Sequence, residues 1–279
     1  MSALLLLTLL ASDAQALSPF AMALAEGDRH YARRAEAARG PVALPAEADA
    51  ALSAYRRALL LDPASLEART KLLKTLFFRG SFCDAPPGVQ LAVFEEAKRV
   101  SNDGIKRIEA PLGRPRAHAA RVAALNGRED VAPIYFWAAV SWGQWALHKG
   151  KIAAAWEGAA GKIRDFLQIA IALNGELEQG SPYLILGRLH DQCPKIPMLT
   201  PWVSRAEALR NLRRAYAIGP DNSVSRYFLA DAILRHDPAH ADEAVRLLRE
   251  CASALPRPEF QVEDAHYAEM ARERLAGVS

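Results

Sequence analysis

The sequence predicts an all-α protein of about 10–12 helices, stacked as antiparallel hairpins into an α-solenoid. The first observation is a spacing of apolar residues that recurs three times. In one copy, Ala208, Leu212 and Ala215 lie at i, i+4 and i+7 and share a helical face, and Pro220 ends the helix. The second is that 16 glycines and 17 prolines separate periodic segments and form no low-complexity tract. The third is a hydrophobic fraction of 51%, which is ample for a continuous core.

The recurring spacing identifies the kind of repeat. Small residues at its first and third positions let a second helix approach closely, and a large residue fills the space between them. The other two copies are Ala51, Tyr55, Ala58 and Pro63, and Ala244, Leu248, Cys251 and Pro256. Ala208 and Ala244 are 36 residues apart, close to the period of about 34 of tetratricopeptide (TPR) repeats. We therefore expect a TPR-like solenoid, with residues 17–279 forming one helical domain.

The N-terminal residues 1–16 have the features of a secretory signal peptide. A short apolar run is followed by Ala14-Gln15-Ala16, and these small residues predict cleavage after Ala16 and a periplasmic mature chain. No basic residue precedes Arg29, so the usual positive segment is missing, and an apolar helix packed on the first repeat is the alternative. No cysteine follows the apolar run, so no lipid anchor is predicted.

The first half of the chain divides at its turn residues. Residues 20–39 form a helical segment that Gly27-Asp28 interrupts, 46–61 the first signature helix, and 66–78 the next helix, which Arg79-Gly80 ends. A long helix over 91–108 follows, with a break near Gly104 as an alternative. Residues 110–116 are irregular, and 116–125 form a short helix.

The middle of the chain holds the most aromatic stretch. Residues 131–149 form one helix in which small alanines alternate with bulky rings, and 151–173 form its partner. Such rings either fill the core of a curved stack or line an apolar concavity, where indole N–H groups orient a ligand. The candidate cavity residues, which include Tyr183 from the following helix, are Tyr135, Trp137, Trp142, Trp145, Trp156 and Tyr183.

The second half continues the pattern. Residues 180–194 form a helix in which Gly187 is expected to touch the 208–215 helix, since a residue without a side chain permits close contact. Residues 222–235 and 242–255 form a final hairpin, and 260–275 an amphipathic capping helix. The three separated cysteines, Cys83, Cys193 and Cys251, are expected in the core.

The order of these segments resembles a known family. It runs from YRRALLLDP through APIYFWAAVSWGQWALHKGK and SPYLILGRLHDQCPKIP to AYAIGPDN. The chain is thereby similar to the T-component family of TRAP (tripartite ATP-independent periplasmic) transporters, most specifically through Ser181-Pro182-Tyr183 and Leu186 to Leu189. The resemblance implies a TPR-type periplasmic protein without enzymatic activity. It would partner the extracytoplasmic solute-binding subunit and hold a hydrophobic ligand.

Other function classes find little support in the sequence. The net charge is +3, and basic residues are interspersed with acidic ones, so no nucleic-acid surface is expected. The dipeptides His190-Asp191 and His236-Asp237 provide too few ligands for a metal site, and no catalytic motif or cofactor motif occurs. Two hypotheses remain: a transport accessory protein with an apolar ligand, and a TPR scaffold that binds other proteins in envelope assembly.

Overall fold

The computed structural model describes residues 17–113 and 117–278, and it confirms the all-α, TPR-like fold. These residues contain thirteen α-helices and four short 3-10 helices. The predicted leader, residues 1–16, lies outside the described residues. The helix bounds are α1 Pro19–Ala32, α2 Pro45–Leu61, α3 Leu66–Ser81, α4 Pro87–Glu109, α5 His118–Ala124, α6 Ala132–Lys149, α7 Lys151–Trp156, α8 Ala159–Asn174, α9 Leu177–Gln192, α10 Arg205–Ile218, α11 Ser223–His236, α12 Ala241–Ser253 and α13 Gln261–Ala276.

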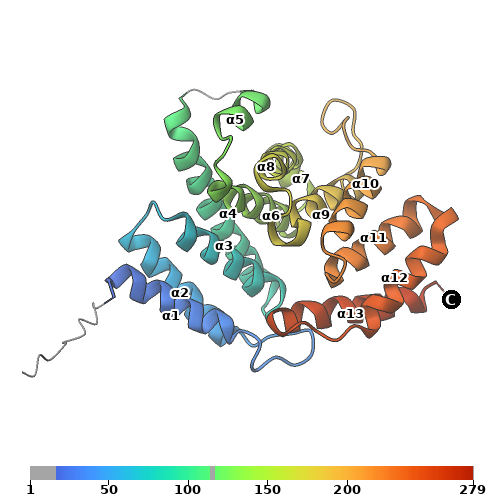
Figure 1. The fold of residues 1–279 in the computed structure, drawn as a ribbon, viewed down its shortest axis with the longest axis horizontal. Coiled ribbons are helices and arrows are strands. Elements are labelled where there is room, and N and C mark those ends of the chain that lie inside the picture. Colours follow the sequence, from blue (N-terminus) through green and yellow to red (C-terminus); the bar gives the residue numbers. More distant parts are fainter. Residues whose placement is uncertain (1–16, 114–116, 279) are drawn as a thin grey trace, which may run out of the picture.

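The long helices form a continuous stack in chain order. Each packs against the one before it and the one after it, from α1 with α2 through to α12 with α13. The short helices α5 and α7 lie beside this series, against α8. Figure 1 shows that the stack curves, so that red α13 returns toward the blue and cyan helices at the start of the chain. The solenoid is therefore strongly bent.

The small residues of the three signatures occupy the helix contacts, as predicted. Ala51 and Ala58 in α2, Ala208 and Ala215 in α10, and Ala244 in α12 have no exposed surface. The large residues between them are buried as well, and Cys251 takes the place of the third small residue without exposure. Small side chains thus recur where the backbones of neighbouring helices come closest.

Gly187 makes the close contact that its position predicts. A Cβ atom at Gly187 would lie 2.7 Å from Cγ of Leu212 and 3.0 Å from the backbone nitrogen of Leu212. Both distances are too short for a real side chain. Helices α9 and α10 can therefore pack at this separation only with glycine at this position.

The predicted interruption at Gly27-Asp28 is wrong. Helix α1 continues through both residues, because Gly27 is the contact point for the ring of Tyr55 in α2, and a Cβ atom would overlap that ring. The Tyr55 hydroxyl donates a hydrogen bond to Asp28 at 2.8 Å. Gly27 and Asp28 therefore hold α1 against α2.

Other expected boundaries also shift. Gly80 lies inside α3, where it faces Phe94, and Gly104 lies inside an unbroken α4, where it faces Arg69 and Ile134. The single helix expected over 151–173 is instead two helices. Gly158 has a left-handed backbone with φ of 64°, which ends α7 and lets α8 start at Ala159.

Helix α13 closes the bend by contacting the first hairpins. The buried guanidinium of Arg34 donates to the Glu259 carbonyl oxygen and to the Glu263 carboxylate, the latter at 3.1 Å. Val262 is fully buried in a cluster that includes Phe78 and Phe82 of the first half. The 260–275 segment therefore caps the last hairpin, as expected, and also joins the two ends of the solenoid.

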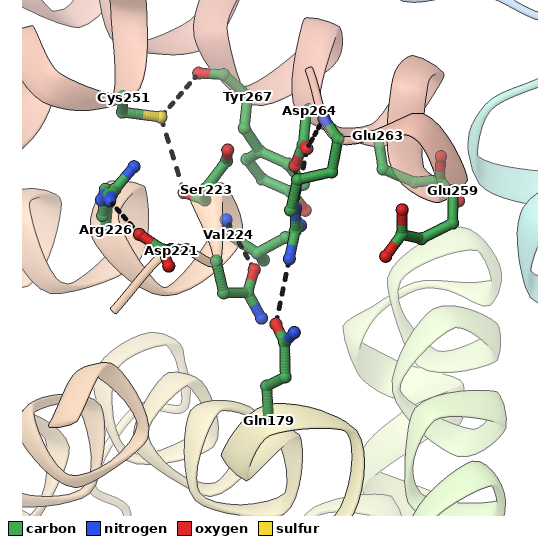
Figure 2. A network of polar contacts seen from close by, with 12 residues as sticks. Gln179, Asp221, Ser223, Val224, Arg226, Cys251, Glu259, Glu263, Asp264 and Tyr267 are labelled. Atoms are coloured by element: carbon green, nitrogen blue, oxygen red, sulfur yellow. Dashed lines mark hydrogen bonds and ion pairs between the residues drawn. The ribbon is translucent and has the colours of Figure 1, made fainter. Parts of the chain in front are cut away.

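A second polar contact supports this closure. Arg257 binds Asp264 through two nitrogens at 2.8 Å each and donates to the Gln179 side chain at 2.9 Å. Figure 2 shows Gln179 pointing from α9 toward the segment that carries Asp264 and Glu263. The start of α9 and the start of α13 are thus tied together.

The cysteines follow the prediction at two of three positions. Cys83 and Cys251 are buried, and burial raises the pKa of each thiol to about 11. Cys193 is half-buried at the end of α9. Within the described residues, no helix combines the length and apolar character needed to cross a bilayer.

Candidate ligand-binding cavity

The bent solenoid surrounds a cavity of about 1520 Å³ that is partly open to solvent. Its walls come from α3, α6, α8, α9, α11 and α13, together with the segment that joins α9 to α10. Helices from both halves of the chain therefore line it, and it depends on the closure made by α13. Its volume exceeds the roughly 300–1,000 Å³ of a typical small-molecule site, so it has room for a ligand with a long apolar body.

The lining of the cavity is rich in aromatic side chains. Phe77 of α3 packs against Trp137 of α6 with ring centroids 5.6 Å apart, and Phe228 of α11 packs against Tyr267 of α13 at 5.4 Å. These pairs come from opposite ends of the chain and present apolar faces to one space. The aromatic lining residues are Tyr31, Phe77, Phe78, Phe82, Phe136, Trp137, Phe228, Phe260 and Tyr267.

Of the six predicted cavity residues, only Trp137 lies in this lining. It is 4% exposed, and its indole N–H is buried with no hydrogen-bond partner among the described residues. A buried donor without an acceptor carries an uncompensated desolvation cost. Trp137 therefore fits a position where a bound molecule can supply an acceptor.

Tyr135, Trp142 and Trp145 are core residues on other faces of α6, so the cavity prediction is wrong for them. The Tyr135 hydroxyl donates to Glu109 at 3.0 Å, and the Trp142 indole donates to Asn102 at 2.9 Å. Lys98 lies over the rings of both Trp142 and Trp145. These rings bind α6 to its neighbour α4.

Trp156 and Tyr183 also lie outside the cavity lining. Trp156 is 87% exposed, because the break at Gly158 ends α7 before the ring reaches the stack. Tyr183 is half-buried against Gly175, with the Arg214 guanidinium 5.9 Å from its ring centre. Neither Trp156 nor Tyr183 therefore forms part of the cavity wall, contrary to the prediction.

Several charged side chains around the cavity are paired. Lys74 and Glu178 form an ion pair at 3.4 Å, and Glu263 is held by Arg34. Asp191, whose side chain is 2% exposed, accepts from His236 at 2.8 Å and from Arg235 at 2.6 Å. These pairs fix the helices that form the walls.

Arg188 is the charged lining residue that sequence reasoning missed. Its guanidinium lies 3.4 Å from the ring centre of Phe228. Burial lowers the pKa of this guanidinium, because a charged group is disfavoured away from water. The available signal was an arginine inside the apolar run YLILGRLH.

The lip of the cavity carries exposed apolar side chains. The end of α6, α7 and the segment from Pro194 to Leu199 all contribute lining residues. The exposed apolar residues on these segments are Leu147, Ile152, Trp156, Ile196, Met198 and Leu199. Of these, Leu147, Ile196 and Leu199 also line the cavity, and exposed apolar groups beside a cavity often mark a binding surface.

The two His-Asp dipeptides contribute to ion pairs. His236 binds Asp191, and His240 binds Asp237 at 2.9 Å. In the part of the chain that the structure describes, no three His, Cys, Asp or Glu residues are grouped so that they could hold a metal ion.

Solved structures include chains similar to this one. No family model matches the chain, and no curated protein matches it. The crystal structure of yeast Tom70 aligns with 97% of this chain and 67% of its own chain, at 16% sequence identity and a TM-score of 0.29.

Proposed function

We propose that this protein is a non-enzymatic binding protein that holds a small apolar ligand in the central cavity. The observation that carries the proposal is the aromatic lining supplied by both ends of a closed solenoid. Burying an apolar molecule there releases its surface from water, which contributes about 25 cal/mol per Å². The unpartnered indole N–H of Trp137 supplies a donor that orients such a ligand.

We further propose that the protein serves a TRAP-type transporter in the periplasm by docking its solute-binding subunit. This part of the proposal rests on the sequence resemblance around Ser181 to Leu189. The exposed apolar lip, with Trp156 and Met198, supports it, because a partner bound there would sit beside the opening of the cavity.

The alternative role is a TPR scaffold for envelope assembly, which needs an open concave face to hold an extended chain or a helix. Here α13 contacts the first hairpins through Arg34 and Val262 and contributes to the inner wall. This closure favours a small ligand over a long peptide inside the solenoid.

Extraction of the protein purified from its native cells tests ligand binding. Mass spectrometry of the denatured extract is expected to recover an apolar compound in a fixed ratio to protein. The stripped protein should rebind this compound with a change in tryptophan fluorescence. An empty extract, together with no response to candidate lipids and organic acids, would contradict the proposal.

Docking is tested separately with Trp156→Ser. Because Trp156 is 87% exposed, we expect an unchanged midpoint of unfolding and at least about tenfold weaker binding of the solute-binding subunit. Leu60→Ser is the matched control, since Leu60 is 80% exposed at the end of α2 and is not in the cavity lining. Equal binding by both variants and the wild type would argue against the lip as the docking face.

A further inference from the structure

We propose that the cavity ligand is an amphiphile with an acidic head group, which is bound by Arg188. This inference rests on the proposed ligand-binding function and specifies its chemistry. The head group is a carboxylate or a phosphate, and the apolar body lies among the aromatic rings of the lining.

The position of Arg188 is the first step. It projects from α9 into the cavity lining, half-buried, with its guanidinium stacked on Phe228. The ring contacts one face of the guanidinium but provides no hydrogen-bond acceptor for its N–H donors. Arg188 forms no hydrogen bond or ion pair with any of the described residues. Its donors therefore remain available to a bound molecule.

The nearest acidic groups are already occupied by other cations. Asp191 binds His236 and Arg235, and Asp231 binds Arg235 at one oxygen and Arg274 at the other, the latter at 3.0 Å. Neither carboxylate is free to approach Arg188. No acidic residue among those described therefore forms an ion pair with Arg188.

The basic residues of the lining outnumber the acidic ones, six against three, and the three acidic ones are all held in ion pairs. Of the six basic residues, Lys74 is paired with Glu178 and Arg257 with Asp264, so four, Arg188 among them, form no ion pair with the described residues. A cavity with an excess of one charge raises the local concentration of ligands of the opposite charge. The basic lining residues are Lys74, Lys151, Arg188, Lys195, Arg205 and Arg257.

An acidic head group resolves this imbalance. A guanidinium binds a carboxylate or phosphate through two parallel hydrogen bonds, and such charge-assisted bonds are among the strongest in proteins. Removing a partly buried cation from water costs less when an anion pairs with it. The ring of Phe228 holds the guanidinium of Arg188 in place. The neighbouring aromatic rings would contact the alkyl or aryl part of the ligand.

Calorimetric titration of the stripped full-length protein with matched ten-carbon probes tests the assignment. The probes are decanoate, decyl phosphate, decanol and decylammonium, each below its micelle concentration at neutral pH. We expect at least about tenfold tighter binding of one or both anions than of decanol, and the weakest binding for the cation. The difference in affinity between decanoate and decyl phosphate shows whether the site prefers a carboxylate or a phosphate head group.

Three variants assign the effect to the residue. Arg188→Met keeps the apolar stem and is expected to remove the preference for anions while leaving decanol binding unchanged. Arg188→Lys is expected to restore part of the preference, since it keeps the charge without the planar fork. Arg249→Met is the matched control, because Arg249 is exposed on α12 outside the cavity lining, and it should behave as the wild type.

The outcomes separate the two proposals. If decanol and the anions bind the wild type equally, or if Arg188→Met keeps the anion preference, the assignment of Arg188 is overturned and the apolar cavity stands. If no probe binds the folded wild type, both proposals fail. Circular dichroism of each variant establishes that it is folded before titration.

Discussion

Trp137 and Trp142 are five positions apart on α6, yet they have different environments. Trp137 faces inward, where its N–H has no partner among the described residues and its ring packs against Phe77. Trp142 faces α4, where Asn102 accepts its N–H and Lys98 covers its ring. The position of each ring on the helix, and not its chemical type, decides whether it faces the cavity or packs against α4.

Replacing Trp142 tests this division. Trp142→Ala should lower the free energy of unfolding by about 3–5 kcal/mol, because it removes a buried ring and leaves a void. Ligand affinity of the folded variant should stay unchanged. Urea unfolding and calorimetric titration measure the two quantities. Retained stability with lost binding would instead make Trp142 part of the site.

The buried His190 and the half-buried His266 predict a dependence of stability on pH. Burial lowers the pKa of His190 and of His266 below the usual value of 6.5. Between the lowered values and 6.5, the unfolded chain binds more protons than the folded one, so stability is lost as the pH falls. Carboxylates titrate with a usual value of 4.5 or lower and contribute little in this range.

Urea unfolding at about pH 7 and about pH 5.5 measures this loss of stability. The wild type should be less stable at the lower pH. His266→Leu should show a smaller difference between the two conditions, since one of the two groups can no longer take up a proton on unfolding. An equal difference in both proteins would exclude His266 as a source.

At the scale of single elements, the contact between α9 and α10 is the most sensitive. Gly187→Ala places a Cβ atom 3.0 Å from a backbone nitrogen that cannot move away. We expect a loss of about 1–3 kcal/mol in the free energy of unfolding, as for other overpacked contacts. Chemical unfolding measures it.

Gly161→Ala in α8 is the matched control. No atom lies within 4 Å of a Cβ at Gly161, so helix propensity alone should raise stability by up to about 1 kcal/mol. If both variants shift stability in the same direction, close packing at Gly187 is not the cause.

Helix identity was predictable from the sequence, whereas several helix ends were not. Apolar periodicity and prolines identified most helices correctly because these signals are local. Glycine was the recurrent source of error: Gly27, Gly80 and Gly104 are contact points inside helices, while Gly158 ends one. A local pattern cannot separate these uses, since the difference lies in a partner helix distant in sequence.

At the scale of the whole molecule, closure of the solenoid creates the site. Arg34 joins α1 to the start of α13, and Phe78 and Phe82 share a buried cluster with Val262. Without these contacts, the inner walls from α3 and α13 would separate. Stability of the closure and integrity of the cavity are therefore coupled.

Arg34→Met tests this coupling. The variant leaves the Glu263 carboxylate buried without its cation, which should cost about 3–5 kcal/mol. Hydrogen exchange should accelerate in α1 and α13 before it does in α8 to α10. Arg33→Met is the control, because Arg33 is exposed and its pairs with Glu36 and Glu47 contribute at most about 1 kcal/mol. Uniform acceleration in both variants would contradict a closing role for Arg34.

The cavity itself was only partly predictable. The aromatic stretch on α6 pointed to one wall, and Trp137 belongs to it. The rings of α3, α11 and α13 come from segments as far apart as Phe77 and Tyr267, and periodicity does not specify which distant helices meet. Arg188 was missed because a charged residue in an apolar run is interpretable only once its neighbours are known.

The most direct test of the account is the crystal structure of the stripped protein with ω-bromodecanoate, located by the anomalous scattering of bromine. We predict α13 in contact with α1, the bromine among Phe77, Trp137 and Tyr267, and the carboxylate on Arg188. Bromine found only on the outer surface, or an open solenoid with α13 away from the first hairpins, would contradict the account.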